Sequence, residues 1–224
     1  MPNKTDRLCR KLQYAFKNQA FLQQALTHRS ASHANNERFE FLGDAILSFT
    51  IASTLFERFP NESEGQLSRL RAHLVKGEML AKIGLELDLG DYLHLGQGEL
   101  KSGGFRRESI LADAMEALFA AVYLDGGIAA AQHVILHLYS TLLNDPDLNN
   151  NLKDAKTQLQ EYLQAHKYAL PKYTLTHVDG EEHDQVFYIL CAIPSLGKTA
   201  KGQGDTRRKA EQDAAQLLLT SIKG

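Results

Sequence analysis

The sequence contains little cysteine and no long apolar run, and each absence excludes a class of protein. The two cysteines, Cys9 and Cys191, lie far apart and do not show the spacing of a zinc site or a disulfide framework. Residues 1–18 are polar and mixed in charge, without the apolar core that a signal peptide needs. No uninterrupted apolar stretch approaches membrane-spanning length, since the best candidate, 114–124, contains Glu116. We therefore expect a soluble, reduced, cytoplasmic protein without a membrane partner.

The sequence also lacks a strong excess of charge of either sign. The formal net charge is −2. Up to residue 150 the chain has 15 basic and 18 acidic residues, and the remainder has 10 basic and 9 acidic residues. The net charge therefore gives no indication of a nucleic-acid partner, and any binding to phosphates must come from local patches.

The periodicity of apolar residues divides the chain into two domains. Between Arg7 and Leu143, apolar residues recur at spacings of three and four, which predicts seven or more helices and no strand. The polar, turn-rich segment 146–153 is typical of an interdomain linker. We therefore predict an all-α domain at 1–145 and a second domain at 154–224.

The second domain shows a mixed pattern of helix and strand. Helical periodicity at both ends encloses three strand-like runs, and the order α-β-β-β-α within about 70 residues fits an α+β fold with both helices on one face of a sheet. The predicted helices are Ala155–His166 and Thr206–Ile222, and the predicted strands are Lys172–Val178, Gln185–Ile193 and Gly197–Gln203.

A run of nine residues, 37–45, sets three carboxylates into an otherwise apolar stretch. At about 100° per residue, Glu40 lies about 60° and Asp44 about 20° from Glu37, so that all three share one side of a helix. Apolar residues cover the opposite side, namely Phe39, Leu42, Ala45, Ile46 and Phe49. We expect this helix to be buried on most of its circumference. A divalent cation is the simplest group that would offset the repulsion within the stripe.

A second acidic pair, Asp113 and Glu116, is spaced by three residues within another apolar stretch. If the two helices pair with their acidic sides facing, four carboxylates converge and supply the hard oxygen ligands that Mg²⁺ prefers. Such an ion activates water and stabilises charge in an in-line phosphoryl displacement. Glu64, from a loop or a helix start, is a further candidate for the same site.

Other interpretations of these residues remain open. Acids spaced by three on an amphipathic helix are usually its solvated face, and Glu64 near a helix N-terminus could serve the helix dipole. His133 and His137, at spacing four, could form a zinc pair, although their helix lacks the Glu of a metalloprotease motif.

Several motifs together resemble the ribonuclease III family. The run 37–45 is similar to the defining motif of this family, and the flanking segments 27–30, 64–69 and 103–113 match it as well. The resemblance covers nearly the entire chain, in the two-domain order of bacterial ribonuclease III. It implies an Mg²⁺-dependent endonuclease for double-stranded RNA that works as a homodimer, with Mn²⁺ as an alternative ion and no small-molecule cofactor.

The resemblance also implies a role for each acid. Asp44 and Glu116 match the acids most closely tied to catalysis, and Glu37 and Glu64 match acids that line the same cleft. The metal-binding acids that it implies are Glu40, Asp44, Asp113 and Glu116. Attack of Mg²⁺-activated water would leave 5′-phosphate and 3′-hydroxyl ends with a short 3′ overhang, because the two sites of a dimer cut opposite strands. The expected substrates are ribosomal RNA precursors and structured messenger RNAs.

Phe41 gives some independent indication of dimerisation. It projects about 40° from Glu37, at the edge of the acidic stripe, where solvent is expected. A phenylalanine there needs cover, which either a symmetry partner or another helix of the same subunit could provide. The family resemblance favours the dimer interface.

Two helices of the second domain present candidate RNA-binding residues. The first helix has one polar face that suits the shallow minor groove of A-form RNA, and the last helix begins with a basic cluster that favours phosphate. The loop between the first two predicted strands, which contains His183, could reach a second groove. The candidates on the two helices are Thr157, Gln160, Glu161, Gln164, Arg207, Arg208 and Lys209. In this order of elements they resemble the double-stranded RNA-binding domain.

One residue departs from the pattern of that domain. The Lys-Lys-x-Ala-Lys pattern occurs here as Arg207-Arg208-Lys209-Ala210-Glu211, with an acid in the last place. We therefore expect modest affinity, a steep loss of affinity with salt, and a preference for duplex shape over sequence.

Two rival functions compete with the nuclease. A protein that holds duplex RNA without cutting would be favoured if a metal-binding acid were missing, and none is. An Mg²⁺-dependent hydrolase of small phosphate esters would have no need of an RNA-binding domain.

Overall fold

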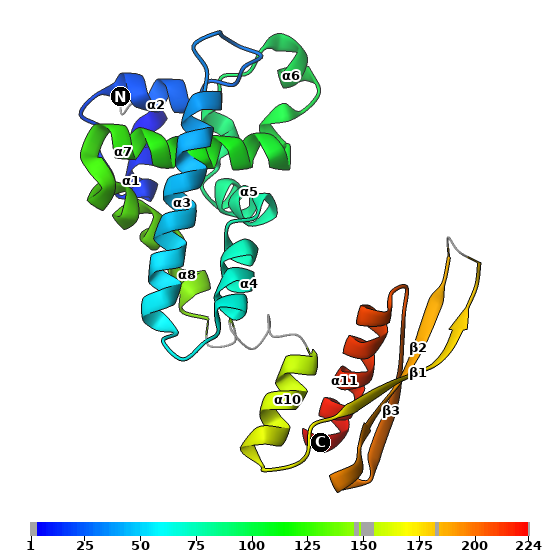
Figure 1. The fold of residues 1–224 in the computed structure, drawn as a ribbon. Helices are drawn as coiled ribbons and strands as arrows, with labels where there is room; N and C mark the ends of the chain where they lie inside the picture. Colours follow the sequence, from blue (N-terminus) through cyan, green and yellow to red (C-terminus); the bar gives the residue numbers. More distant parts are fainter. Residues whose placement is uncertain (1–3, 146–147, 149–154, 182–183, 224) are drawn as a thin grey trace. The chain divides into compact units, whose positions relative to one another are not determined.

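The computed structural model describes residues 4–145, 148, 155–181 and 184–223. It divides the chain into two compact units, residues 1–149 and 150–224 (Figure 1). The predicted linker, 146–153, lies almost entirely outside the described residues.

The N-terminal unit is helical, as predicted. Its helices are α1 (Lys4–Leu12), α2 (Gln19–Ala25), α3 (Glu37–Arg58), α4 (Glu64–Leu74), α5 (Gly77–Glu86), α6 (Gln97–Lys101), α7 (Glu108–Leu138) and α8 (Ser140–Leu143). Two short 3₁₀ turns, η1 (Leu89–Tyr92) and η2 (Gly104–Arg106), connect the middle helices. The only extended pairing among the described residues of this unit is an isolated bridge between Thr27 and His94.

Two central helices, α3 and α7, cross in direct backbone contact (Figure 1). Gly43 on α3 makes this approach possible, since a Cβ atom at this position would lie 1.8 Å from the carbonyl oxygen of Glu116 on α7. That distance is far shorter than a van der Waals contact, so position 43 has room for the hydrogen atom of glycine and not for a methyl group. The crossing therefore brings the acidic turns of the two helices side by side.

One face of α3 is more exposed than the sequence pattern predicts. The phenylalanines Phe41, Phe49 and Phe56 are 80%, 58% and 72% exposed. The buried residues of α3 are Gly43, Ile46, Leu47, Thr50, Ile51 and Leu55. The expectation that this helix is buried on most of its circumference is therefore wrong for a single chain. The reason is that α7 and α4 pack against only one side of it.

By length and composition alone, α3 and α7 are long and apolar enough to cross a membrane. Core helices of soluble proteins pass the same test, and here 33% and 50% of the relevant windows are buried within the structure. A search for uninterrupted apolar runs misses both helices because carboxylates interrupt them.

The C-terminal unit has the predicted α-β-β-β-α order. Its elements are α10 (Ala155–Ala165), β1 (Lys172–Asp179), β2 (Val186–Ile193), β3 (Lys198–Gly204) and α11 (Arg207–Lys223). The strands form an antiparallel sheet in the order β1-β2-β3, with an irregularity between Leu175 and His177. Alternate residues of β2 (Ile189, Cys191 and Ile193) enter one core with apolar residues of α10 and α11, so both helices cover the same face.

Candidate active site and RNA-binding surface

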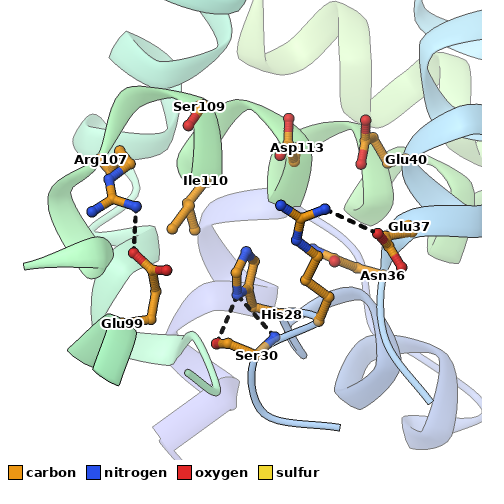
Figure 2. A pocket seen from close by; sticks show the side chains of 11 residues that line it. His28, Ser30, Asn36, Glu37, Glu40, Glu99, Arg107, Ser109, Ile110 and Asp113 are labelled. Atoms are coloured by element: carbon orange, nitrogen blue, oxygen red, sulfur yellow. Dashed lines mark hydrogen bonds and ion pairs between the residues drawn. The ribbon is translucent and has the colours of Figure 1, made fainter. Parts of the chain in front are cut away.

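A polar pocket of about 520 Å³ opens beside the crossing of α3 and α7. Figure 2 shows Glu40 from α3 and Asp113 from α7 close together at one end, with Glu99 and Arg107 at the other. The pocket is lined by His28, Arg29, Ser30, Asn36, Glu37, Glu40, Glu99, Arg107, Ser109, Ile110 and Asp113. The sequence-predicted acids Glu37, Glu40 and Asp113 therefore share one cavity.

Two acids of the pocket have raised pKa values. Burial raises the pKa of Glu40, and the neighbouring carboxylates of Asp113 and Glu37 raise it further. Burial also raises the pKa of Asp113, while its electrostatic interactions with His28 and Arg29 oppose that effect. Like charges in partly buried positions disfavour ionisation, and the shift of Glu40 is consistent with its position beside other carboxylates.

Glu116 lies one turn beyond Asp113 on α7 and has the largest shift among the acids. Burial raises its pKa to about 8, and the carboxylates of Asp44, Glu40 and Asp113 contribute, in that order. Asp44 is exposed and accepts a 3.4 Å hydrogen bond from the hydroxyl of Ser48. Glu116 therefore interacts electrostatically with the other three predicted metal-binding acids.

Tyr139 is a residue near the acids that the sequence pattern did not single out. Its ring is fully buried, and its hydroxyl donates a 3.1 Å hydrogen bond to the backbone carbonyl of Leu74. Burial and the charge of Glu116 raise the pKa of the Tyr139 hydroxyl. Tyr139 therefore lies near enough to Glu116 for the two groups to interact, and its hydrogen bond to Leu74 at the end of α4 holds its ring in place.

The acid cluster has the donor chemistry of a site for a hard divalent cation. All four side chains present carboxylate oxygens, and their mutual repulsion favours a cation between them. Within the described ranges, no three His, Cys, Asp or Glu side chains are close enough to hold an ion as they stand. Mg²⁺ characteristically keeps several waters and uses few carboxylates together with substrate phosphates, so the residues present fit this ion.

The zinc interpretation of His133 and His137 gains no support. The Nε2 atom of His137 lies 3.2 Å from the backbone carbonyl of Lys11, which accounts for the position of its ring. That contact joins α7 to the end of α1.

Basic side chains on the rim of the pocket were missed as individual candidates. Arg29 forms an ion pair with Glu37 at 3.5 Å, and Arg107 forms one with Glu99 at 2.5 Å (Figure 2). The side chain of Ser30 accepts a hydrogen bond from the backbone N–H of Gly96 and lies 2.8 Å from the ring of His28. The sequence offered a way to find them, because Arg29, Ser30 and Arg107 lie within the segments 27–30 and 103–113, which match the family motifs.

Glu64 does not line this pocket in a single chain. It begins α4, where its carboxylate accepts a 2.7 Å hydrogen bond from the hydroxyl of Ser68. It belongs instead to a second hollow of about 420 Å³, which lies between α3 and α4. That hollow is lined by Ala52, Leu55, Phe56, Glu62, Glu64, Leu67, Ser68 and Arg71.

The C-terminal unit brings three predicted RNA-binding residues together. Thr157 and Gln160 on α10 and Arg208 on α11 line a third hollow, of about 390 Å³. Arg207 and Lys209 form ion pairs with Glu211 at 3.3 Å and with Asp205 at 2.5 Å. Glu161 and Gln164 lie on α10, and His183 lies outside the described residues.

Comparisons with known proteins identify the family to which each unit is similar. Residues 18–143 match the ribonuclease-III-like family, and residues 155–222 match the double-stranded RNA binding motif. Proteins named ribonuclease 3 from Legionella pneumophila and Nitrosococcus oceani are 65% identical over 219 residues and 56% identical over 226 residues. The first match covers 98% of both chains, and the second covers 99% of this chain and 96% of its relative.

The N-terminal unit also resembles solved structures. Two structures of the nuclease domain of ribonuclease III from Campylobacter jejuni are 41% identical to this chain, with TM-scores of 0.61 and 0.60. The two matches span 62% and 65% of this chain, and 97% and 98% of the respective solved chains. The chain therefore belongs to the ribonuclease III family, with a helical nuclease domain followed by a double-stranded RNA-binding domain.

Proposed function

We propose that this ribonuclease III family nuclease is an Mg²⁺-dependent endoribonuclease. It hydrolyses double-stranded RNA and leaves 5′-phosphate and 3′-hydroxyl ends. The observation that carries the proposal is the convergence of four carboxylates where α3 crosses α7, with the pKa of Glu116 raised to about 8. Mn²⁺ can replace Mg²⁺ because carboxylate oxygens also suit that ion.

Each acid has a defined place in the proposed site. The ion would be held by Glu40, Asp44, Asp113 and Glu116. The chemistry that bound Mg²⁺ supplies is activation of water and stabilisation of charge during in-line displacement at phosphorus. The raised pKa of Glu116, about 8, favours the protonated form of its carboxyl group at pH 7, and a cation among the four acids would favour the ionised form that can act as a ligand. Asp44 and Glu116 are the acids that we assign to catalysis.

Cations beside the acids would guide the substrate. Arg29 and Arg107 line the same pocket as Asp113, and an RNA strand brings negative phosphates. Both arginines are held by acids in the free protein, Arg29 by Glu37 and Arg107 by Glu99. RNA phosphates would therefore replace Glu37 and Glu99 as the partners of these arginines. Because both arginines are paired before RNA binds, the free protein does not have to keep an unpaired cation in the pocket.

We propose a homodimer in which Phe41 of one subunit enters the hollow between α3 and α4 of the other. Phe41 is 80% exposed, and the walls of that hollow are largely apolar, with Ala52, Leu55, Phe56 and Leu67 among them. In a dimer with twofold symmetry, Phe41 of each subunit can fill the apolar hollow of the other, so that both exposed surfaces are buried.

The dimer would also complete the active site. Phe41 is the neighbour of Glu40, and Glu64 lies on the rim of the hollow that would receive it. Docking would therefore bring Glu64 of one subunit to the acid cluster of the other, which explains why Glu64 stands apart in a single chain. The solved nuclease domain from Campylobacter jejuni is described as having a region involved in dimer formation, which supports a dimer as such.

The substitution Phe41→Asp tests the dimer. It places a charge on the surface that would be buried, and we expect the variant to sediment as a monomer where the natural protein sediments as a dimer. A suitable control is Leu100→Asp, which changes an apolar residue on α6 that is 54% exposed and lies outside the hollow. Dimerisation that survives Phe41→Asp, or that Leu100→Asp disrupts equally, would contradict this role for Phe41.

The C-terminal domain supplies the grip on the duplex in this proposal. Its polar face on α10 and basic cluster on α11 would contact minor-groove hydroxyls and phosphates. The substrates that we propose are ribosomal RNA precursors and structured messenger RNAs in the cytoplasm, without a membrane partner or a small-molecule cofactor.

A cleavage experiment with three substrates separates this function from its rivals. We expect cleavage of a perfect RNA duplex with Mg²⁺ and none in EDTA. We expect no cleavage of either separated strand, and none of p-nitrophenyl phosphate. A ligase should join the 5′-phosphate ends of the products to an adaptor that carries a 3′-hydroxyl, and their 3′-hydroxyl ends to an adaptor that carries a 5′-phosphate, without prior end repair. Binding without cleavage would support a duplex-binding regulator instead, and turnover of the small ester would support a phosphoesterase.

A further inference from the structure

Glu211 stands in the last place of the Lys-Lys-x-Ala-Lys pattern, and its negative charge is paired with two basic side chains of this chain. One carboxylate oxygen accepts a 2.6 Å hydrogen bond from Nζ of Lys156, and the other lies 3.3 Å from Nε of Arg207. Its side chain is only 16% exposed, and that of Lys156 is 34% exposed. The Lys156 hydrogen bond holds the pKa of Glu211 below its usual range. This pair is therefore more shielded from solvent than an ordinary surface ion pair.

Lys156 joins three elements of the domain at one point. Its ammonium group lies over the ring of Tyr173 on β1, 4.6 Å from the ring centroid, and Tyr173 packs against the domain core. Its backbone N–H, in the first turn of α10, donates a 3.0 Å hydrogen bond to the side chain of Gln212 on α11. Adjacent residues of α11 thus hold both the backbone and the side chain of Lys156, which fixes the start of α10 against α11.

The contacts between Lys156 and α11 lie beside the predicted RNA-binding residues, in the same hollow. The hollow of about 390 Å³ that Lys156, Glu211 and Gln212 help to line is completed by Thr157, Gln160 and Arg208. The side chain of Arg208 makes no hydrogen bond or ion pair within the part of the chain that the structure describes. It is thus the arginine at the start of α11 that is available to a phosphate, whereas Arg207 is engaged by Glu211.

We propose that Glu211 is a positioning residue for duplex RNA: through Lys156 it sets the spacing between the polar face of α10 and Arg208. This inference rests on the proposed function, because it assumes that these residues contact RNA. A duplex presents its 2′-hydroxyls and its phosphates at fixed separations, so two contact groups on different helices bind together only if the helices are held at a matching distance. An acid at position 211 therefore favours RNA binding in this chain.

The test is the affinity of the full chain for a perfect RNA duplex, measured by fluorescence anisotropy in EDTA so that no cleavage occurs. If Glu211 only repels phosphates, Glu211→Gln should tighten binding. If it positions α10, Glu211→Gln should weaken binding by about fivefold to twentyfold and lower the salt dependence by roughly one phosphate contact. Glu211→Lys, which completes the Lys-Lys-x-Ala-Lys pattern, should also weaken binding despite the added positive charge.

Asp205→Asn is the matched control. Asp205 is also an acid at the start of α11 and pairs with a basic residue, Lys209, but both of these side chains are about two-thirds exposed, at 64% and 67%. Removing its charge should leave affinity unchanged or tighten it slightly, because it joins no second element. Loss of the charge is therefore expected to weaken binding at position 211 and not to weaken it at position 205.

A double-mutant cycle shows whether Glu211 acts through Lys156. Lys156→Gln should weaken binding as Glu211→Gln does, and the double variant should be no weaker than either single variant. Thermal unfolding of each variant checks that the domain remains folded, and Lys156→Gln provides a second route if Glu211→Lys does not fold. Binding of Glu211→Gln that equals or exceeds that of the natural chain would overturn the proposal. Failure of the natural chain itself to bind duplex RNA would overturn the proposed function as well.

Discussion

Gly43→Ala is expected to abolish duplex cleavage and to destabilise the nuclease domain strongly. The added methyl group would lie 1.8 Å from the carbonyl oxygen and 2.4 Å from the carbonyl carbon of Glu116, both of which are backbone atoms. Backbone atoms at the crossing of two packed helices shift only at a large cost in free energy, so overpacking here should cost about 3 kcal/mol, the upper end of the usual range. Separation of α3 from α7 would also draw Glu40 and Asp44 away from Asp113 and Glu116.

Thermal unfolding and cleavage rate measure this prediction together. A loss of about 3 kcal/mol corresponds to a melting temperature roughly 6–12 °C lower for a chain of this size. The control is Gly65→Ala on α4, where a Cβ atom would meet nothing within 4 Å. That substitution should raise helix propensity and leave stability unchanged or improved by about 0.5–1 kcal/mol. A Gly43→Ala protein that melts and cleaves like the natural protein would contradict the geometry of the crossing.

Glu116→Gln is expected to stabilise the metal-free protein while removing its response to Mg²⁺. The ordinary pKa of a glutamate is 4.5, and in the fold burial and the three neighbouring carboxylates raise that of Glu116 to about 8. The charged form is therefore disfavoured in the folded state. An isosteric amide removes the charge and keeps the shape, so the repulsion among the remaining acids falls.

The sign of the pH dependence follows from the raised pKa. Below pH 4.5 Glu116 is protonated in both the folded and the unfolded state and has no net effect. As pH rises from 4.5 to about 8 the unfolded chain loses its proton while the folded chain keeps it, so the free energy of unfolding falls. Above that range Glu116 is ionised in both states. Its effect is then a constant reduction of the free energy of unfolding, on the order of 2 kcal/mol after allowance for partial exposure.

Denaturation in EDTA between pH 5 and pH 8 tests this expectation. The natural protein should lose stability over the range relative to Glu116→Gln, and Mg²⁺ should restore stability only to the natural protein. Glu57→Gln, an exposed acid at the far end of α3, is the control and should change stability by less than about 0.5 kcal/mol. Parallel pH profiles for the natural and Glu116→Gln proteins would show that Glu116 does not carry the repulsion.

The sequence predicted the order of elements and the acids but not the environment of α3. Spacing placed Glu40 and Asp44 on one side of a helix, and the structure brings them into electrostatic contact with Asp113 and Glu116. The same spacing predicted cover for Phe49, which is 58% exposed. Periodicity shows that a helix has an apolar side, but it does not show whether the same chain covers that side.

Contacts between distant segments were also beyond the sequence pattern. The pair between Glu211 and Lys156 joins residues 55 positions apart, so an acid that looked unfavourable for RNA in the sequence is neutralised in the fold. Gly43 could be identified as part of a motif, but its reason, contact with the backbone of Glu116, requires the crossing of two helices. Local patterns specify local structure, whereas these contacts depend on how elements pack.

The central claim, that the acid cluster is the catalytic centre, is tested most directly by single-turnover cleavage of a perfect RNA duplex with Mg²⁺. We predict that Glu116→Gln cuts at least about 10³-fold more slowly than the natural protein, because it removes a ligand of the ion without changing the shape of the site. Duplex binding should persist, because the C-terminal domain is unchanged. Cleavage by Glu116→Gln at the natural rate would contradict the claim and move the catalytic centre away from the crossing of α3 and α7.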